Sequence, residues 1–318
     1  MSKAVYYFCA DNTKDPVSNN VFQCLTTLVP MTETDIEVDG YKVFEHTDEK
    51  GNLFQFVRIQ EVLSHNYQKY LPYMQKYFSE FDFAGLVNWH EGANAPEKVL
   101  TVHSTGDVPS GIFGATNSTL FKNLIIAINQ NRIKNGLDDF ITSTEATHWS
   151  GMPYHGKPEW ITDYTVPIYD VEIGSYKSSW QNENAIKVLA SSLCSVFTNS
   201  TNNSERLYTL LCVGGVHFEE SFSKTILSET HPLSIGHILP NQWLIGYEED
   251  VTGLEKFERS VNSVIGGIHA IVFHDNIKSI YKQLCKIIGE RHGVSVFKHK
   301  TLRDLDRTLL SIKGTANL

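Results

Sequence analysis

Short apolar runs alternate along the chain with segments of helical periodicity. The runs are rich in β-branched and aromatic residues and end at turn or polar residues, so they predict buried strands. They cover residues 4–10, 53–59, 83–89, 98–104, 165–174, 207–215 and 268–275. Apolar residues three or four positions apart predict amphipathic helices within 63–74, 186–197 and 277–288. Pro72 predicts a break or kink in the first helix. Strands that alternate with helices indicate an α/β sheet with helices on both faces.

The composition is that of an ordinary globular protein. With 318 residues, of which 41% are hydrophobic and 20% charged, the chain can build one large α/β domain over 1–318. The most polar segment, 198–205, predicts a loop too short to separate two domains. No run approaches the roughly 20 apolar residues of a membrane span, and the first residues lack a signal-peptide pattern. We therefore expect a cytoplasmic protein without membrane contact, and we expect it to be a monomer.

Charge is spread unevenly over the chain. The net charge of −9 argues against a surface coated for nucleic acid, and we expect no DNA partner. Residues 278–313 nevertheless hold nine basic and three acidic side chains, a balance of +6, which leaves −15 for the rest of the chain. This basic segment is either a local phosphate-binding surface or simply a solvated helix face and tail.

The segment "TSTEATHWSG", residues 142–151, places an acidic residue and a histidine three positions apart. In a helical turn Glu145 and His148 would share one face and could share a ligand. The same letters fit a capping box, with Thr142 at the N-cap and Glu145 at the third helical position. The segment alone does not decide between a metal or acid–base pair and a structural helix start.

Other strand-like runs end in residues of catalytic type. In open α/β sheets, ligands bind beyond the carboxyl ends of the strands, so these residues would gather along one rim. They are His90, His103, Glu172, Gly174, Ser175, Gly214, Gly215 and His217. Imidazoles with carboxylates suit zinc, or general acid–base hydrolysis without a metal. The glycines would let a substrate approach backbone N–H groups that stabilise an oxyanion. The five cysteines form no CxxC pair, so a thiolate zinc site is not indicated.

The order of five motifs is more specific than any one of them. "VLTVHSTGD", "STEATHWSG", "VEIGSYKSSW", "VGGVHFEESF" and "HPLSIGHILP" follow one another within residues 83–240. Together they resemble the archaeal and plant family of D-aminoacyl-tRNA deacylases, whose stretches read approximately LTVH-x-x-GN, EATHHGP, EIGS-x-x-xW, GGGHY and GHI-[LI]-PK. The resemblance implies a phosphorylase/hydrolase-like α/β fold with a mixed sheet, similar to peptidyl-tRNA hydrolases. It also implies hydrolysis of the ester between a D-amino acid and the tRNA 3′ end, with zinc as the associated metal.

The resemblance assigns expected roles to the matching positions. His103 and His148 would activate water, directly or through zinc, while Glu145 and Glu172 orient or coordinate; the expected zinc ligands are His103, His148 and Glu145. Contacts to the substrate would come from a second group: His90, Gly174, Ser175, Gly214, Gly215, His217 and His237. The basic segment 278–313 would hold the acceptor phosphates of aminoacyl-tRNA. Alanine at 103 or 145 should abolish activity without unfolding the protein.

The chain departs from the family pattern at several motif positions. The changed residues are Asp107, Trp149, Ser150, Val216 and Asn241. An added carboxylate at 107, together with lost arginines on either side of His90, predicts weaker attraction to a tRNA end. Two alternatives therefore stay open: a zinc-dependent amidohydrolase or peptidase acting on a small acyl substrate, and a non-catalytic module that binds a tRNA end.

Overall fold

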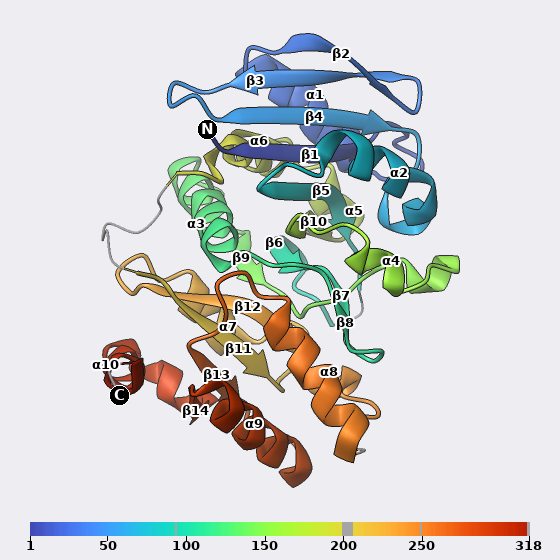
Figure 1. Ribbon diagram of the computed structural model, residues 1–318. Helices are drawn as coiled ribbons and strands as arrows, with labels where there is room; N and C mark the ends of the chain where they lie inside the picture. The colour runs from blue at the N-terminus through green and yellow to red at the C-terminus, as the bar shows by residue number, and fades with distance from the viewer. Residues whose placement is uncertain (93, 199–205, 249, 317–318) are drawn as a thin grey trace.

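A large mixed sheet forms the N-terminal two thirds of the protein (Figure 1). The computed structural model describes residues 1–92, 94–198, 206–248 and 250–316, so most of the predicted loop at 198–205 lies outside the described residues. The strand order is β2 (Thr32–Val38), β3 (Tyr41–Thr47), β4 (Leu53–Ile59), β1 (Lys3–Cys9), β5 (Phe83–His90), β10 (Ile168–Ser175), β6 (Lys98–Ser104) and β9 (Ile141–Thr144). Strands β1, β4, β5 and β10 are parallel, whereas β6 and β9 run antiparallel to β10.

A small parallel sheet follows in the C-terminal part. Its order is β12 (Leu233–Leu239), β11 (Tyr208–Val213), β13 (Ala270–Phe273) and β14 (Ser295–Lys298). A two-stranded ribbon, β7 (Gly106–Asp107) with β8 (Ile112–Phe113), completes the sheet structure described. All seven predicted strands are confirmed, as β1, β4, β5, β6, β10, β11 and β13.

Helices cover both faces of both sheets, as expected. On the large sheet, α1 (Ser18–Leu28) and α6 (Glu183–Ser192) pack on one face, and α2 (Tyr67–Phe78) and α4 (Glu159–Thr162) on the other. On the small sheet, α7 (Glu220–Ile226) and α10 (Leu305–Ala316) lie opposite α8 (Asp250–Asn262) and α9 (Ser279–His292). Helix α2 continues through Pro72 instead of breaking there. No helix in the described part of the chain is long and apolar enough to span a membrane.

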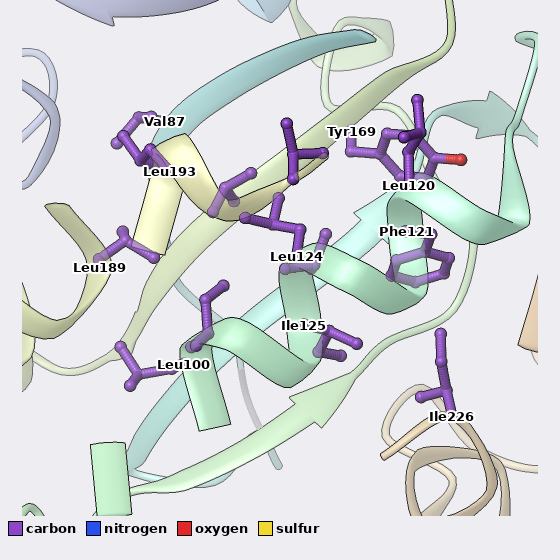
Figure 2. Close-up of a cluster of buried hydrophobic side chains, with 14 of the residues drawn as sticks. Val87, Leu100, Leu120, Phe121, Leu124, Ile125, Tyr169, Leu189, Leu193 and Ile226 are labelled. Atoms are coloured by element: carbon purple, nitrogen blue, oxygen red, sulfur yellow. The ribbon is translucent and has the colours of Figure 1, made fainter. Parts of the chain in front are cut away.

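The main hydrophobic core continues from one sheet to the other through α3 (Ser118–Lys134), which lies between them (Figures 1 and 2). Residues 120–128 of α3 are buried on almost every side, as expected of a helix packed on all sides. Leu124 and Ile125 belong to the same cluster as Leu100 of β6 and Ile226 of α7. The two sheets therefore share one continuous apolar interior.

The segment that follows β9 joins the two sheets through backbone hydrogen bonds. The backbone N–H of Ala146 donates to the carbonyl of His217 (2.9 Å), and that of Thr147 donates to the carbonyl of Ile238 (2.9 Å). Thr142 lies inside strand β9 and is paired with Leu100. The predicted helical turn and capping box at 142–148 are therefore wrong. Apolar burial and pairing with β6 outweigh the local capping signal.

Candidate active site

One face of the large sheet changes from apolar to polar along three adjacent strands. Residues two apart on a strand share a face, and Leu86 and Ile168 on this face pack toward α2 and α4. Further along β5, β10 and β6, the same face carries Asn88, His90, Asp170, Glu172, Thr101 and His103, all buried. The antiparallel pairing of β6 with β10 places His103 opposite Asp170. Sequence reasoning missed Asp170, although its spacing from Glu172 in "YDVEIG" gave the signal.

Backbone carbonyls fix the orientation of two histidines. His103 Nδ1 lies 3.1 Å from the carbonyl oxygen of Ser104, and His148 Nδ1 lies 2.9 Å from that of Ala146. A carbonyl only accepts, so each Nδ1 carries the proton and each Nε2 keeps its lone pair in the neutral ring. The two rings stack with centroids 3.8 Å apart. This tautomer, held by a backbone acceptor, is typical of metal-ligating histidine.

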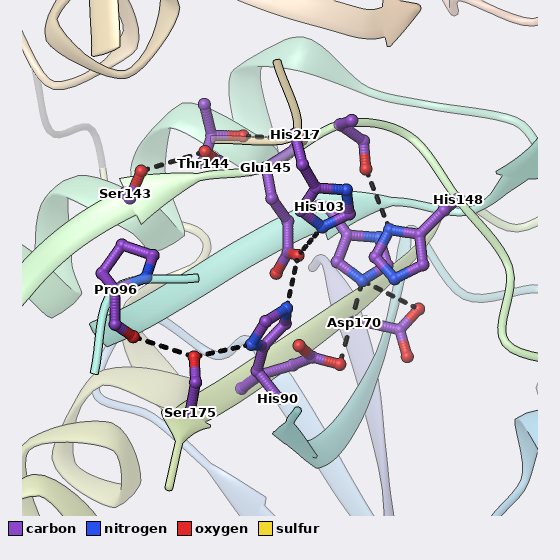
Figure 3. Close-up of polar contacts among 12 residues, drawn as sticks. His90, Pro96, His103, Ser143, Thr144, Glu145, His148, Asp170, Ser175 and His217 are labelled. Carbon is purple, nitrogen blue, oxygen red and sulfur yellow. Dashed lines mark hydrogen bonds and ion pairs between the residues drawn. The ribbon is translucent and has the colours of Figure 1, made fainter. Parts of the chain in front are cut away.

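A third histidine is fixed by a hydroxyl. Ser175 Oγ donates to the carbonyl of Pro96 (2.9 Å), so His90 Nδ1–H donates to Ser175 Oγ (2.8 Å). In the neutral ring, His90 Nε2 then turns a lone pair toward Glu145 Oε2, 3.3 Å away. Two facing acceptors are compatible only with a proton or another cation between them. His217 Nε2 approaches the same carboxylate oxygen at 2.6 Å (Figure 3).

Several buried polar atoms in this cluster have no hydrogen-bond partner among the described residues. They are His103 Nε2, Glu145 Oε1, Glu172 Oε2 and the Thr101 hydroxyl. His103 Nε2 lies 3.8 Å from Glu172 Oε1 and 3.9 Å from Asp170 Oδ2, too far for hydrogen bonds. Two ligands on one zinc ion, each at about 2.0–2.1 Å, lie roughly 3.4 Å apart in tetrahedral geometry.

These residues fit a metal ion. His103, Glu145 and His148 bring ligand atoms within 4.8 Å of one another, as do His103, Asp170 and Glu172. A third overlapping group consists of His90, Glu145 and His217. Nitrogen and carboxylate donors of this kind suit zinc, and the unpartnered atoms are the ones a cation would satisfy. The predicted ligand set is thus one of three that the geometry allows.

Burial dominates the electrostatics of the cluster. It lowers the pKa of His103 to about 4 and that of His148 to about 3, so both rings are neutral at neutral pH. It raises the pKa of Asp170 to about 7, and burial beside other carboxyls raises the pKa of Glu172 well above its usual range. Burial alone would also raise the pKa of Glu145, but the surrounding imidazoles hold it below its usual range.

A cleft of about 790 Å³ opens above the cluster. His90, His148, Glu172 and His217 line its polar base. Its walls are largely aromatic and include Trp89, Trp149, Tyr154, Phe218 and Trp243. The cleft combines apolar walls with a few convergent polar groups, as small-molecule sites do.

The structure separates the predicted site residues into three groups. Four of them line the cleft, as given above. His103 and Glu145 lie directly beneath it, about 1% exposed. Five others lie outside the lining: Gly174, Ser175, Gly214, Gly215 and His237.

The residues outside the lining have local structural tasks. A Cβ at Gly174 would lie 2.6 Å from His90 Cβ, so glycine permits the close approach of β10 to β5. The Gly214 N–H donates to the Leu239 carbonyl (2.7 Å), and the Ser175 N–H donates to the Glu97 carbonyl (2.6 Å). The Gly214 amide is therefore already used between the ends of β11 and β12, and the expected oxyanion contact from backbone amides near Gly174, Gly214 and Gly215 stays a prediction.

His237 is fully buried between the sheets. Its Nδ1 lies 3.0 Å from Ser104 Oγ and 3.2 Å from Thr147 Oγ1, and its Nε2 lies 2.9 Å from Ser263 Oγ. Ser104 follows His103, and Thr147 precedes His148. His237 therefore holds together the two segments that carry the stacked histidines, and it does not reach the cleft.

The fold and the site define a class: an α/β protein with a buried histidine–carboxylate cluster beneath an open, aromatic-walled cleft. The family model of D-aminoacyl-tRNA deacylase matches residues 77–297, which contain the whole cluster. The chain belongs to this family.

Similar proteins match this chain over most of its length and nearly all of their own. A D-aminoacyl-tRNA deacylase of Pyrococcus abyssi is 25% identical over 297 residues, covering 89% of this chain and 96% of that protein. One from Pyrobaculum neutrophilum is 26% identical over 287 residues, with the same coverage. A solved structure described as a conserved protein of unknown function matches with a TM-score of 0.72 at 20% identity, over 96% of this chain and 98% of that one. The last match shows a shared fold.

Proposed function

We propose that this chain hydrolyses the ester bond of D-aminoacyl-tRNA, releasing the free D-amino acid and tRNA. One observation carries the proposal beyond family membership: at the base of the cleft and directly beneath it, His103 Nε2, Glu145 Oε1 and Glu172 Oε2 are buried with no hydrogen-bond partner among the residues that the structure describes. Each unpartnered buried polar group opposes folding by about 1–3 kcal/mol. Several in one cluster, aimed at one place, are expected of a site kept for chemistry.

Zinc is part of the proposal, with His103, His148 and Glu145 as its expected ligands and Glu172 beside them. When bound there, zinc would lower the pKa of a bound water to about 7 and polarise the ester carbonyl. The preset Nδ1–H tautomers of His103 and His148 support this role, because no reorientation is needed before the Nε2 atoms bind.

The remaining site residues position the substrate and handle protons. If water is activated directly and not through zinc, the same lone pair of His148 Nε2 accepts the proton of the attacking water, because the Ala146 carbonyl holds its other nitrogen protonated. Glu145 holds His217 at 2.6 Å, which directs that imidazole at the cleft base. Ser175 orients His90 in the same way. The aromatic walls offer the substrate apolar surface to pack against.

The decisive experiment is single-turnover deacylation of matched D- and L-aminoacyl-tRNA, with and without a chelator. We expect loss of the D-ester only, and its suppression by the chelator. His103→Ala should remove the activity, while His46→Ala on strand β3 serves as the matched control. Stability of both esters would contradict the proposal. Turnover of a small acyl amide in their place would favour the amidohydrolase alternative, and tRNA binding without turnover the binding module.

Some expectations stay predictions. They are a single domain over 1–318, a cytoplasmic monomer, the absence of a DNA partner, and the likeness to phosphorylases and peptidyl-tRNA hydrolases.

A further inference from the structure

One edge of the small sheet begins at the cleft and continues beyond it. Its four strands are parallel, so all their carboxyl ends lie along the same edge. Residues 216–218, which follow β11, and residues 242–243, which follow β12, line the cleft. The strand order β12-β11-β13-β14 then carries the same edge away from the cleft, past the ends of β13 and β14.

Three lysines gather where β13 and β14 end, together with a histidine whose pKa is lowered by burial. Lys278 follows β13, and Lys298, His299 and Lys300 follow one another at the end of β14. The side chains of Lys278 and Lys300 are 66% and 58% exposed. The His299 ring stacks on His274, with centroids 3.9 Å apart, which ties the ends of the two strands together. We call Lys278, Lys298, His299 and Lys300 the basic edge.

The acids that face the basic edge hold it loosely. Lys300 pairs with Asp275 at 2.6 Å and Lys278 with Glu248 at 3.7 Å. Exposed pairs of this kind contribute about 0–1 kcal/mol, so a phosphate can replace a carboxylate at small cost. On the other side of the stacked histidines, Glu219 lies 3.7 Å from His274.

The structure divides the basic segment 278–313 instead of presenting it as one surface. Arg291 and His292, near the end of α9, both pair with Glu258 (3.0 and 2.7 Å).

At the far edge of the large sheet, β2 carries three acids at 33, 35 and 37. The exposed lysines of the basic edge can therefore offer a phosphate cationic partners beside the cleft, whereas β2 cannot.

We propose that the basic edge binds backbone phosphates of the tRNA acceptor end while the terminal aminoacyl-adenosine occupies the cleft. From β11 to β14 the edge spans two strand spacings, about 10 Å. At about 3.4 Å per stacked nucleotide, this corresponds to roughly three nucleotides. The inference rests on the proposed function and adds the path by which the substrate leaves the cleft.

The test compares a full substrate with a truncated one. Lys298→Glu combined with Lys300→Glu is measured on D-aminoacyl-tRNA and on D-aminoacyl-adenosine, which lacks the acceptor phosphates. We expect KM for the tRNA to rise about tenfold or more at low salt, with KM for the adenosine ester unchanged. The slope of log affinity against log salt should fall by about 1–2. The matched control, Lys50→Glu with Lys134→Glu, makes the same charge change in the β3–β4 turn and at the end of α3.

Each other outcome has a defined meaning. An unchanged KM for tRNA, an equal rise in the control, or an equal rise for both substrates would overturn the basic edge. Lys298→Gln with Lys300→Gln guards against misfolding, and its effect should be intermediate. If the unmodified protein hydrolyses neither ester, the proposed function fails. Binding of uncharged tRNA to the same variants then still tests the surface: weaker binding than the control supports it, and equal binding overturns it.

Discussion

Two buried polar regions of this protein follow opposite rules. Lys122 on α3 is fully buried, and its ammonium donates to the carbonyls of Ile226 (2.9 Å), Ser228 (2.8 Å) and Leu233 (2.8 Å). Burial lowers the pKa of Lys122 to about 7. In the ammonium form three donors meet three acceptors, so every hydrogen is used. These bonds join α3 to the end of α7 and the start of β12. The arrangement fixes the fold and offers nothing to a ligand.

The second region is the histidine–carboxylate cluster beneath the cleft, on the other side of strands β6 and β9. By the same measure, its hydrogen bonding is incomplete. His103, Glu145 and Glu172 each keep a buried polar atom that no described residue pairs with. Because folding disfavours such atoms, their convergence beneath a cleft separates a functional interior from a structural one. The number of satisfied donors and acceptors distinguishes the two regions, whereas burial alone does not.

The largest effect should come from removing the side-chain amine of Lys122, whose hydrogen bonds are complete. Lys122→Met removes the donor from two buried carbonyls and one part-buried carbonyl, and should lower the free energy of unfolding by about 3–5 kcal/mol. Chemical denaturation measures the loss. The same change at exposed Lys134, on the same helix, should stay within about 0.5 kcal/mol. Activity per folded molecule should not change; a loss of stability below about 1 kcal/mol would contradict the structural role.

In the histidine–carboxylate cluster, a substitution should lower the activity strongly and the stability only slightly. Glu172→Gln keeps the shape of the side chain but removes a carboxylate oxygen, and should lower the deacylation rate about 100-fold, equivalent to about 2.7 kcal/mol. The free energy of unfolding should change by less than about 1 kcal/mol, because the replaced oxygen has no partner to lose. Single-turnover rates and denaturation are measured together, with Glu49→Gln as the exposed control. A Glu172→Gln variant that loses stability but keeps its activity would show that Glu172 serves the fold and not the reaction.

Asp15 is an intermediate case, and its effect appears only as the pH rises. Its Oδ1 accepts from the N–H groups of Val17 and Ser18, while its Oδ2 has no partner in the described part of the chain. Burial raises its pKa to about 7. The folded state therefore binds an extra proton between about pH 4 and pH 7, and its stability falls as the pH rises through that window.

Asp15→Asn cannot ionise and should be free of this loss. At pH 8 the variant should be more stable than the unmodified protein by at least about 1 kcal/mol, and at pH 4 the two should be equal. Thermal unfolding across the pH range measures both. A variant less stable at pH 8 would show that the ionised carboxylate is favoured at the start of α1.

Much of this organisation was readable from local patterns. The buried strands were found because β-branched and apolar runs have one clear period, and the five ordered motifs identified the family. The segment around Glu145 was misread because Thr142 and Glu145 imitate a helix cap, while pairing with Leu100 makes it strand β9. The spacing of Asp170 from Glu172 places both on one face of a strand, but the pairing of Asp170 with His103 depends on the antiparallel direction of β6, which local sequence does not reveal.

The sequence by itself determined the α/β class, the positions of most strands, and the residue types available for chemistry. Only the tertiary structure decided which imidazole nitrogens keep their lone pairs, which glycines serve packing, and which cations share an edge with the cleft. The reason is physical: periodicity and burial are properties of consecutive residues. Hydrogen-bond satisfaction and charge proximity depend instead on backbone groups and strands that are distant in the chain.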